Sequence, residues 1–206
     1  MRAIYRYERS RCYNRVMIEL VREAYRLKEE IRTGWELRGV RDPESVADHS
    51  WGTAYLVLLY ADEAGVDRAR AVEIAIVHDL AEARTGDIAT RVAEMHEPGR
   101  AQRKRQREEA AIEELTSSYP QARARHVVGL WREYEERVTP EAHFVREMNL
   151  IDMCLQAYAY EAARRYDPSK PNEHFPDFEG LDEFFATSAP RIESETGRRL
   201  FAELSS

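Results

Sequence analysis

The segment that most constrains this chain is residues 76–91, IVHDLAEARTGDIATR, because it sets ionisable side chains in an apolar stretch. His78 and Asp79 are adjacent, and Glu82 and Asp87 follow them. Burying such groups costs free energy unless a partner compensates for the lost water. Imidazole and carboxylate together are ligands of divalent transition metals, so the residue types favour a metal ion as that partner.

The spacing of these residues limits where the ion can lie. Consecutive residues of a helix point about 100° apart, so His78 and Asp79 can share an ion only if it lies off the helix, between their two directions. Glu82 falls on the same face, one turn later. A further ligand must come from another helix, and His49 in VADHS is the candidate. A lone buried histidine is more often a core residue, but the convergence of His78, Asp79, Glu82 and Asp87 favours an ordered metal and water.

Nearly every segment of the 206 residues has a helical pattern, and none alternates as a strand does. We therefore predict a single all-α domain spanning residues 1–206. Residues 67–86 are expected to form the central buried helix, because residues 74–77 are apolar all round. Other helices are expected from Pro43 and Ser45 to Gly65, over about 100–117, from Pro120, from Pro140, and over about 180–203.

The helix that Pro140 opens has the clearest periodicity in the chain. Its apolar residues recur at spacings of 4, 3, 4, 3 and 4, at Phe144, Met148, Ile151, Leu155, Tyr158 and Ala162. This stripe is expected to face the core. A neighbouring stripe at positions 145, 149, 152 and 156 places Asn149 and Asp152 one turn apart.

Composition excludes several classes of function. A net charge of −7 argues against a nucleic-acid polymer as the main partner, because such binding rests on neutralising phosphates. No apolar run approaches the roughly 18 residues of a membrane span. The charged start, MRAIYRYERSRCYNRV, is atypical of a secretory signal. Cys12 and Cys154 form no disulfide framework, so we expect a reducing cytoplasm.

One segment is locally basic. In GRAQRKRQR, residues 99–107, five of the last eight residues are Lys or Arg. Charge runs usually form a solvated helix face, and that interpretation is favoured here. The alternative is a cationic lip that draws in a small phosphorylated ligand.

The motifs taken together are more specific than any one of them. ADHS followed by HDLAE and TGD resembles the HD-domain superfamily of metal-dependent phosphohydrolases. With RTGWELRGVRDPESVADHS and FVREMNLIDMCLQAYAYE, the chain is similar to the 5′-deoxynucleotidase branch. The resemblance covers roughly residues 15–165.

This resemblance implies an all-α HD fold with one divalent metal ion, such as Mn²⁺, Co²⁺, Zn²⁺, Fe²⁺ or Ni²⁺. It implies hydrolysis of deoxyribonucleoside 5′-monophosphates to nucleoside and phosphate. The implied ligands are His49, His78, Asp79 and a fourth residue from the later helix. Glu82 matches the family's catalytic acid/base, and Asp87 matches its second functional acid.

The substrate side of the resemblance is less complete. Trp35 matches a tryptophan near the sugar that is proposed to disfavour a 2′-hydroxyl. Some members have arginine just before it, where this chain has Gly34. Arg32 is a candidate to supply that charge, since its guanidinium can bond phosphate through two N–H groups. Packing is an equally reasonable role for Trp35.

The fourth metal ligand is where the chain departs from the family. The family's aspartate falls on Asn149, and Asp152 falls where the family usually has glutamate. Asn149 could ligate through its amide oxygen with weaker affinity. Asp152 could take over after a small helix shift. In a third interpretation the metal is weak or absent, and the chain is a catalytically weakened nucleotide-binding relative.

The leading functional hypothesis is thus a metal-dependent phosphoric monoester hydrolase of the 5′-nucleotidase type. The alternative is an HD phosphohydrolase for a different small or modified nucleotide, prompted by Gly34 and Asn149. The resemblance also suggests a homodimer, and apolar side chains such as Trp131 and Phe184 are expected to be exposed for it.

Overall fold

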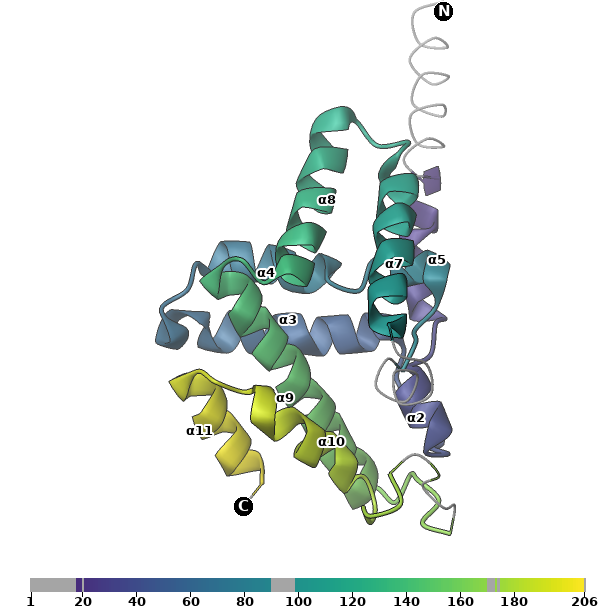
Figure 1. The fold of residues 1–206 in the computed structure, drawn as a ribbon, viewed down its shortest axis with the longest axis vertical. Coiled ribbons are helices and arrows are strands. Elements are labelled where there is room, and N and C mark those ends of the chain that lie inside the picture. Colours follow the sequence, from purple (N-terminus) through teal and green to yellow (C-terminus); the bar gives the residue numbers. More distant parts are fainter. Residues whose placement is uncertain (1–17, 20, 90–98, 170–172, 174, 206) are drawn as a thin grey trace, which may run out of the picture.

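The computed structural model describes residues 18, 19, 21–89, 99–169, 173 and 175–205. Within these residues the chain is all-α, as expected, and its one β-type pairing is an isolated bridge between Ile31 and Ser45. The elements are η1 (Ala24–Lys28), α2 (Thr33–Leu37), α3 (Val46–Ala64), α4 (Arg68–Val77), α5 (Glu82–Thr85), α7 (Arg100–Thr116), α8 (Gln121–Glu136), α9 (Pro140–Ala162), α10 (Asp182–Ser188), η2 (Ala189–Arg191) and α11 (Glu195–Leu204). Figure 1 shows their order along the chain.

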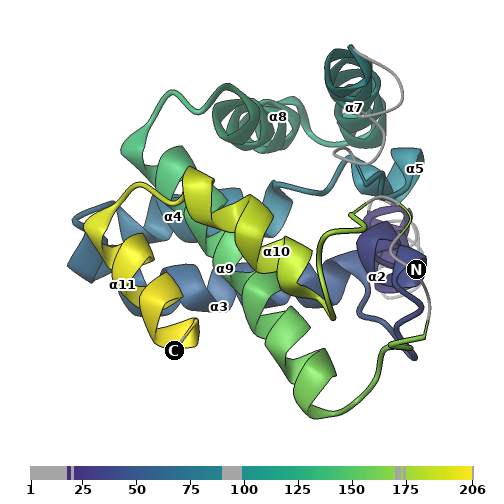
Figure 2. The same cartoon turned by 60° about the horizontal axis from the view of Figure 1, so that its bottom comes forward.

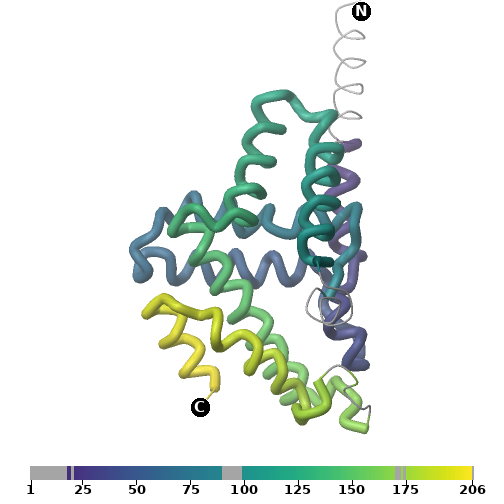
Figure 3. Tube along the Cα trace, in the orientation of Figure 1, coloured from purple at the N-terminus to yellow at the C-terminus, as the bar shows by residue number. Residues whose placement is uncertain are grey.

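Three helices form the centre of the fold. α3 and α4 run side by side, and α9 crosses both of them (Figure 1). Their apolar side chains make the largest buried cluster, which includes Val57, Ile74, Met148 and Ile151. Each such side chain contributes about 1.5–3 kcal/mol when it is fully buried. The helices α7 and α8 pack against each other on one side of this crossing (Figure 3).

Local sequence signals fix where α3 begins and ends. Ser45 caps its N-terminus by accepting a hydrogen bond from the backbone N–H of Asp48, whose carboxylate accepts one from the N–H of Ser45. Gly65 ends the helix with a φ of 70°, which favours glycine. These caps place His49 in the first turns of α3, facing α4 and α9.

The predicted helix over residues 67–86 is interrupted. Asp67 caps it as expected, but α4 ends at Val77 and a turn leads to the short α5. The Nδ1–H of His78 donates to the carbonyl of Ala75 at 2.7 Å, the acceptor that a continuing helix would give to the N–H of Asp79. The His-Asp pair therefore stands at the C-terminal end of the central helix, and Asp79 lies in the turn.

The C-terminal region also differs from the prediction of one helix over about 180–203. It forms α10, the 3₁₀ turn η2 and α11, with α10 lying along α9 (Figure 2). Pro190 stands in η2, where its ring suits the start of a helix and not its interior. Ser194 then caps α11 by accepting from the N–H of Gly197. In the described residues no helix is both long and apolar enough to cross a bilayer.

Two expectations about exposure are wrong. Trp131 is only 1% exposed, and Phe184 is half-buried and stacked on Trp35. The stripe of α9 is buried at its start but not throughout, since Leu155 is 39% and Tyr158 58% exposed. The exposed apolar side chains of the two packed helices α3 and α9 are Trp51, Tyr55, Leu58, Leu59, Leu155 and Tyr158. We call this set the α3–α9 surface.

Candidate metal centre

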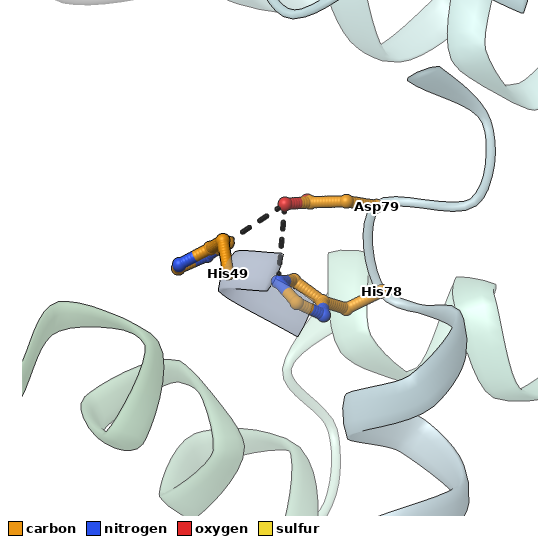
Figure 4. A group of neighbouring side chains, drawn as sticks. All are labelled: His49, His78 and Asp79. Atoms are coloured by element: carbon orange, nitrogen blue, oxygen red, sulfur yellow. Dashed lines mark ion pairs between the residues drawn. The ribbon is translucent and has the colours of Figure 1, made fainter. Parts of the chain in front are cut away.

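Three side chains from the expected set converge where α3 meets the end of α4. The Oδ2 atom of Asp79 lies 3.1 Å from Nε2 of His78 and 3.8 Å from Nε2 of His49. Figure 4 shows both rings directed toward this carboxylate. The arrangement presents two imidazole nitrogens and one carboxylate oxygen to a common point. This is a ligand set of the kind that catalytic metal sites use.

Each histidine is oriented by a hydrogen bond on its far side. Nδ1 of His78 bonds the carbonyl of Ala75, and Nδ1 of His49 lies 2.7 Å from Oδ2 of Asp152. Both Nδ1 atoms therefore carry the proton, which leaves the Nε2 atoms as lone-pair donors. Fixing the tautomer in this way is the usual second interaction of a metal-binding histidine.

Burial keeps His49 in the neutral form that ligation requires. The pKa of His49 is lowered to about 3, first by burial and then by the positive charge of Arg32. Burial raises the pKa of Asp152 to about 7. The two pKa shifts indicate that little water reaches the Nδ1 side of His49. There one short hydrogen bond satisfies both the imidazole of His49 and the carboxyl of Asp152.

Asp152 can approach His49 because Gly52 has no side chain. A Cβ on Gly52 would lie 2.0 Å from Oδ1 of Asp152, far inside van der Waals contact. The carboxylate thus occupies the space above α3 that any other residue would fill. Asp152 lies on the Nδ1 side of His49, away from the two unpartnered Nε2 atoms.

Asn149 stands one turn earlier in α9 and has different neighbours. It is buried, and its Nδ2 donates to the hydroxyl of Tyr134 at 3.0 Å. The ring of Tyr134 lies 5.1 Å from that of His78, edge to face. Asn149 also lines the main cavity beside Asp79. The predicted neighbours Asn149 and Asp152 therefore bond different partners, Tyr134 and His49.

The side chains fit a divalent metal ion. Nε2 of His49 and Nε2 of His78 are both buried and without a hydrogen-bond partner in the part of the chain that the structure describes. A buried polar nitrogen without a partner costs about 1–3 kcal/mol. A divalent cation bound between the two nitrogens and the carboxylate would accept their lone pairs and offset this cost. Imidazole and carboxylate suit Mn²⁺, Fe²⁺, Co²⁺, Ni²⁺ and Zn²⁺ alike.

Glu82 stands beside this centre and is 3% exposed. Its Oε1 accepts from Nζ of Lys104 at 3.0 Å, while Oε2 is buried and has no partner within residues 21–89, 99–169 and 175–205. Burial, and then the negative charge of Asp79, raises the pKa of Glu82 well above its usual range. A carboxyl with a raised pKa can both take and give a proton near neutral pH.

Asp87 and Arg32 form a second polar group at the centre. Oδ2 of Asp87 accepts from the backbone N–H of Thr33 at 2.6 Å, and the Thr33 hydroxyl donates to the Asp87 carbonyl at 2.7 Å. Nη1 of Arg32 lies 3.5 Å from Oδ2 of Asp79 and 3.6 Å from Oδ1 of Asp87. Asp87 thus ties the start of α2 to the site and holds Arg32 next to Asp79.

Trp35 is 1% exposed, and its Nε1–H donates to Oε1 of Glu44 at 2.8 Å. Its ring stacks on Phe184 with 4.2 Å between centroids. A Cβ on the neighbouring Gly34 would lie 3.6 Å from the Phe184 ring. Trp35 is therefore a packed residue whose edge also lines the cavity.

Beside the two histidines lies a cavity of about 740 Å³, a size that suits a nucleotide. Its wall includes Arg32, Trp35, Asp79, Glu82, Asp87 and Asn149. Sequence reasoning missed Lys104, Tyr134, Phe184 and Gly52. Lys104 belongs to the basic run, whose favoured interpretation as a solvated face is wrong at this position because Lys104 turns inward to Glu82.

Comparisons with known proteins agree with this geometry. The chain matches the HD domain family over residues 24–190. It is 36% identical to 5′-deoxynucleotidase HDDC2 of Homo sapiens over 147 residues, 71% of this chain and 69% of that protein. It is 34% identical to 5′-deoxynucleotidase hdd1 of Schizosaccharomyces pombe over 154 residues, 73% and 74% of the two chains.

Solved structures show the same architecture. PH0347 protein from Pyrococcus horikoshii OT3 superposes with a TM-score of 0.70 at 32% identity, covering 91% of this chain and 96% of that one. A predicted metal-dependent phosphohydrolase from Magnetospirillum magnetotacticum MS-1 superposes with a TM-score of 0.64 at 26% identity, covering 92% and 88%.

Proposed function

The chain belongs to the HD domain family, and we propose that it is a metal-dependent phosphohydrolase that releases phosphate from (deoxy)nucleoside 5′-monophosphates. The observation that carries the proposal is a pair of buried Nε2 atoms, those of His49 and His78, which have no hydrogen-bond partner among the described residues and lie beside Asp79, a residue that lines a nucleotide-sized cavity. Several similar proteins are 5′-deoxynucleotidases, which supports this substrate class.

His49, His78 and Asp79 would hold the ion, and Asn149 is the fourth ligand that we favour. Its place on the cavity wall, with Nδ2 bound to Tyr134, supports ligation through the amide oxygen. A bound divalent ion polarises phosphoryl oxygens and lowers the pKa of water. Asp152 has the separate task of holding the Nδ1–H of His49.

Glu82 would move the proton. Its raised pKa and its partner-free Oε2 suit an acid/base that takes a proton from the attacking water or gives one to the leaving 5′-oxygen. Arg32 would bind the phosphate, since its guanidinium lies between Asp79 and Asp87 at the cavity. Asp87 would hold Arg32 and the start of α2 in place.

Trp35 and Phe184 would form the apolar wall for the sugar and base. Their stacked rings line the cavity, and an apolar wall with few polar groups is typical of ligand pockets. A rigid aromatic surface at the sugar favours a deoxyribose, because an added 2′-hydroxyl would lose water there without a partner.

The test is phosphate release from each deoxyribonucleoside and ribonucleoside 5′-monophosphate with Mn²⁺, Co²⁺, Zn²⁺, Fe²⁺ or Ni²⁺ added to chelator-treated protein. We expect release that requires the metal and is lost in Glu82→Gln. No release from any nucleotide with any of these ions would refute the proposal.

A modified nucleotide is the second candidate substrate. The observation that favours it is the Phe184 ring, which lies 3.6 Å from the place of a Cβ on Gly34, the position where the family resemblance includes arginine in some members. A panel with base-modified and sugar-modified monophosphates separates the two candidates. Equal kcat/KM on all ordinary deoxynucleotides would exclude this second one.

A homodimer is our proposal for the assembled protein, with the α3–α9 surface as the contact. Six exposed apolar side chains on two packed helices support it, since a second copy that covered them would remove apolar area from water. Light scattering should give a dimer mass that falls to a monomer in Trp51→Ser but not in Val138→Ser, a change of another exposed apolar residue.

The buried free thiol of Cys154 is consistent with the reducing cytoplasm that we propose as the location of the protein.

A further inference from the structure

The basic run of α7 places one cation in the site, and its contacts are specific. Nζ of Lys104 lies 3.0 Å from Oε1 of Glu82 and 3.2 Å from Oε1 of Glu108, one turn later on the same helix. The Lys104 side chain is 18% exposed, Glu82 is 3% exposed and Glu108 is 6% exposed. Three largely buried charged side chains, Glu82, Lys104 and Glu108, therefore join α5 to α7.

The ion pair makes the two oxygens of Glu82 unequal. Oε1 is bound by Lys104, and Oε2 has no partner among the described residues. A carboxylate held by one oxygen cannot rotate freely, so the other oxygen has a defined direction. Oε2 is thus the atom free to bond water or the leaving oxygen.

We propose that Lys104 is a positioning residue that selects Oε2 of Glu82 as the reacting oxygen. Glu108 in turn competes for the ammonium of Lys104 and so weakens its ion pair with Glu82. The proposal deepens the proposed function, because it rests on Glu82 as the acid/base of the site. Neither residue of α7 needs to touch the substrate for this role.

The charges around Glu82 set the sign of the effect. Burial, Asp79 and Asp87 raise its pKa, whereas Lys104 and Arg32 lower it. Glu108 competes for the ammonium of Lys104, and burial raises the pKa of Glu108 to about 7. Removing Lys104 should therefore raise the pKa of Glu82, and removing the charge of Glu108 should lower it.

The experiment follows the titration of Glu82 in the metal-free, ligand-free protein by carbon NMR of labelled Glu side chains, with the signal assigned by its loss in Glu82→Gln. Lys104→Met should move the midpoint upward by about one to three pH units. Glu108→Gln should move it downward. Lys104→Arg should restore the wild-type midpoint, and Arg107→Met, an exposed cation on the same helix, should leave it unchanged.

The two variants should move the midpoint in opposite directions, which a general loosening of the site would not do. The kcat/KM profile then separates a positioning role from an ion pair that only stabilises the fold. If Lys104→Met fails to fold, Glu108→Gln alone still decides the sign. An unchanged midpoint in Glu108→Gln, or in a folded Lys104→Met, would overturn the proposal. A rise in KM with an unchanged kcat in Lys104→Met would show instead that Lys104 binds the substrate directly, and this too would overturn the proposal.

The readout is independent of catalysis, so the two proposals can fail separately. If no nucleotide is hydrolysed but the midpoints move as expected, the network stands and the proposed reaction is wrong. If hydrolysis occurs, the limb of the kcat/KM profile that Glu82 governs should move to higher pH in Lys104→Met and return in Lys104→Arg.

Discussion

Two segments contribute to the proposed metal centre in different ways. At the end of α4, the proposed ligands are adjacent in sequence, and a local bond from His78 to the carbonyl of Ala75 orients the first of them. In α9, Asn149 and Asp152 are one turn apart, yet Asp152 bonds His49 whereas Asn149 bonds Tyr134 and lines the main cavity. The first arrangement is specified by neighbours in the chain. The second depends on how α9 is rotated against α3.

The largest effect is expected from a substitution in the pair at the end of α4. Asp79→Ala removes the carboxylate that both Nε2 atoms face, so stoichiometric metal binding should be lost. Activity should fall by about a hundredfold or more, since the ion contributes several kcal/mol to the transition state. Elemental analysis and phosphate release measure the two losses. Asp62→Ala, which changes an exposed acid of α3, is the control; equal metal content in both variants would contradict the assignment.

The next effect tests the α9 segment. Asp152→Ala should weaken metal binding about 10–100-fold, because the Nδ1–H of His49 loses the acceptor that orients the ring. Asp152→Asn keeps an acceptor oxygen and should lose less. Competition with a chelating dye measures both constants. If Asp152→Asn were as damaging as Asp79→Ala, Asp152 would be a ligand and our separation of the two α9 residues would be wrong.

An acid titration probes the same contact without metal. The pKa of His49 is about 3 in the folded chain against an ordinary value of 6.5, so below pH 6.5 the unfolded chain binds the extra proton first. The free energy of unfolding should therefore fall as the pH drops from about 6.5 toward 3. Urea denaturation should show a flatter dependence in His49→Gln. His126→Gln, at a half-exposed histidine, should keep the wild-type slope.

The smallest effect is expected at Asn149, the second of the two α9 residues. Asn149→Asp adds a negative charge to the cavity wall that Asp79 also lines, and should tighten metal binding by about tenfold, or ~1.4 kcal/mol. Asn149→Ala should weaken it. The chelator competition gives both values. Unchanged affinity in both variants would show that residue 149 does not ligate.

The features that could be predicted from the sequence are those set by residues close together in the chain. The all-α class, the caps at Ser45, Asp67 and Gly65, and the family of the chain are confirmed. These features depend on residues close together or on a recurring pattern. The ligand roles of His49, His78 and Asp79 remain predictions, although the structure brings the three side chains together.

The remaining features required coordinates. Nothing in the local sequence says that His78 takes the Ala75 carbonyl and ends α4. The division after residue 180 is different, because Pro190 and the Ser194 cap are local signals that the prediction of one helix did not use. The burial of Trp131 and the inward turn of Lys104 depend on which helices pack against α7 and α8. Hydrophobic periodicity gives a face to each helix but not the identity of its neighbour.

The bond between His49 and Asp152 joins residues 103 positions apart. During synthesis, the helix that carries His49 and the turn that carries Asp79 emerge from the ribosome well before α9 does. Until then the His49 ring has neither its fixed tautomer nor a dry environment, so the nascent chain should not retain an ion. Metal loading is therefore expected to be a late event, available only to a chain whose C-terminal half has already docked.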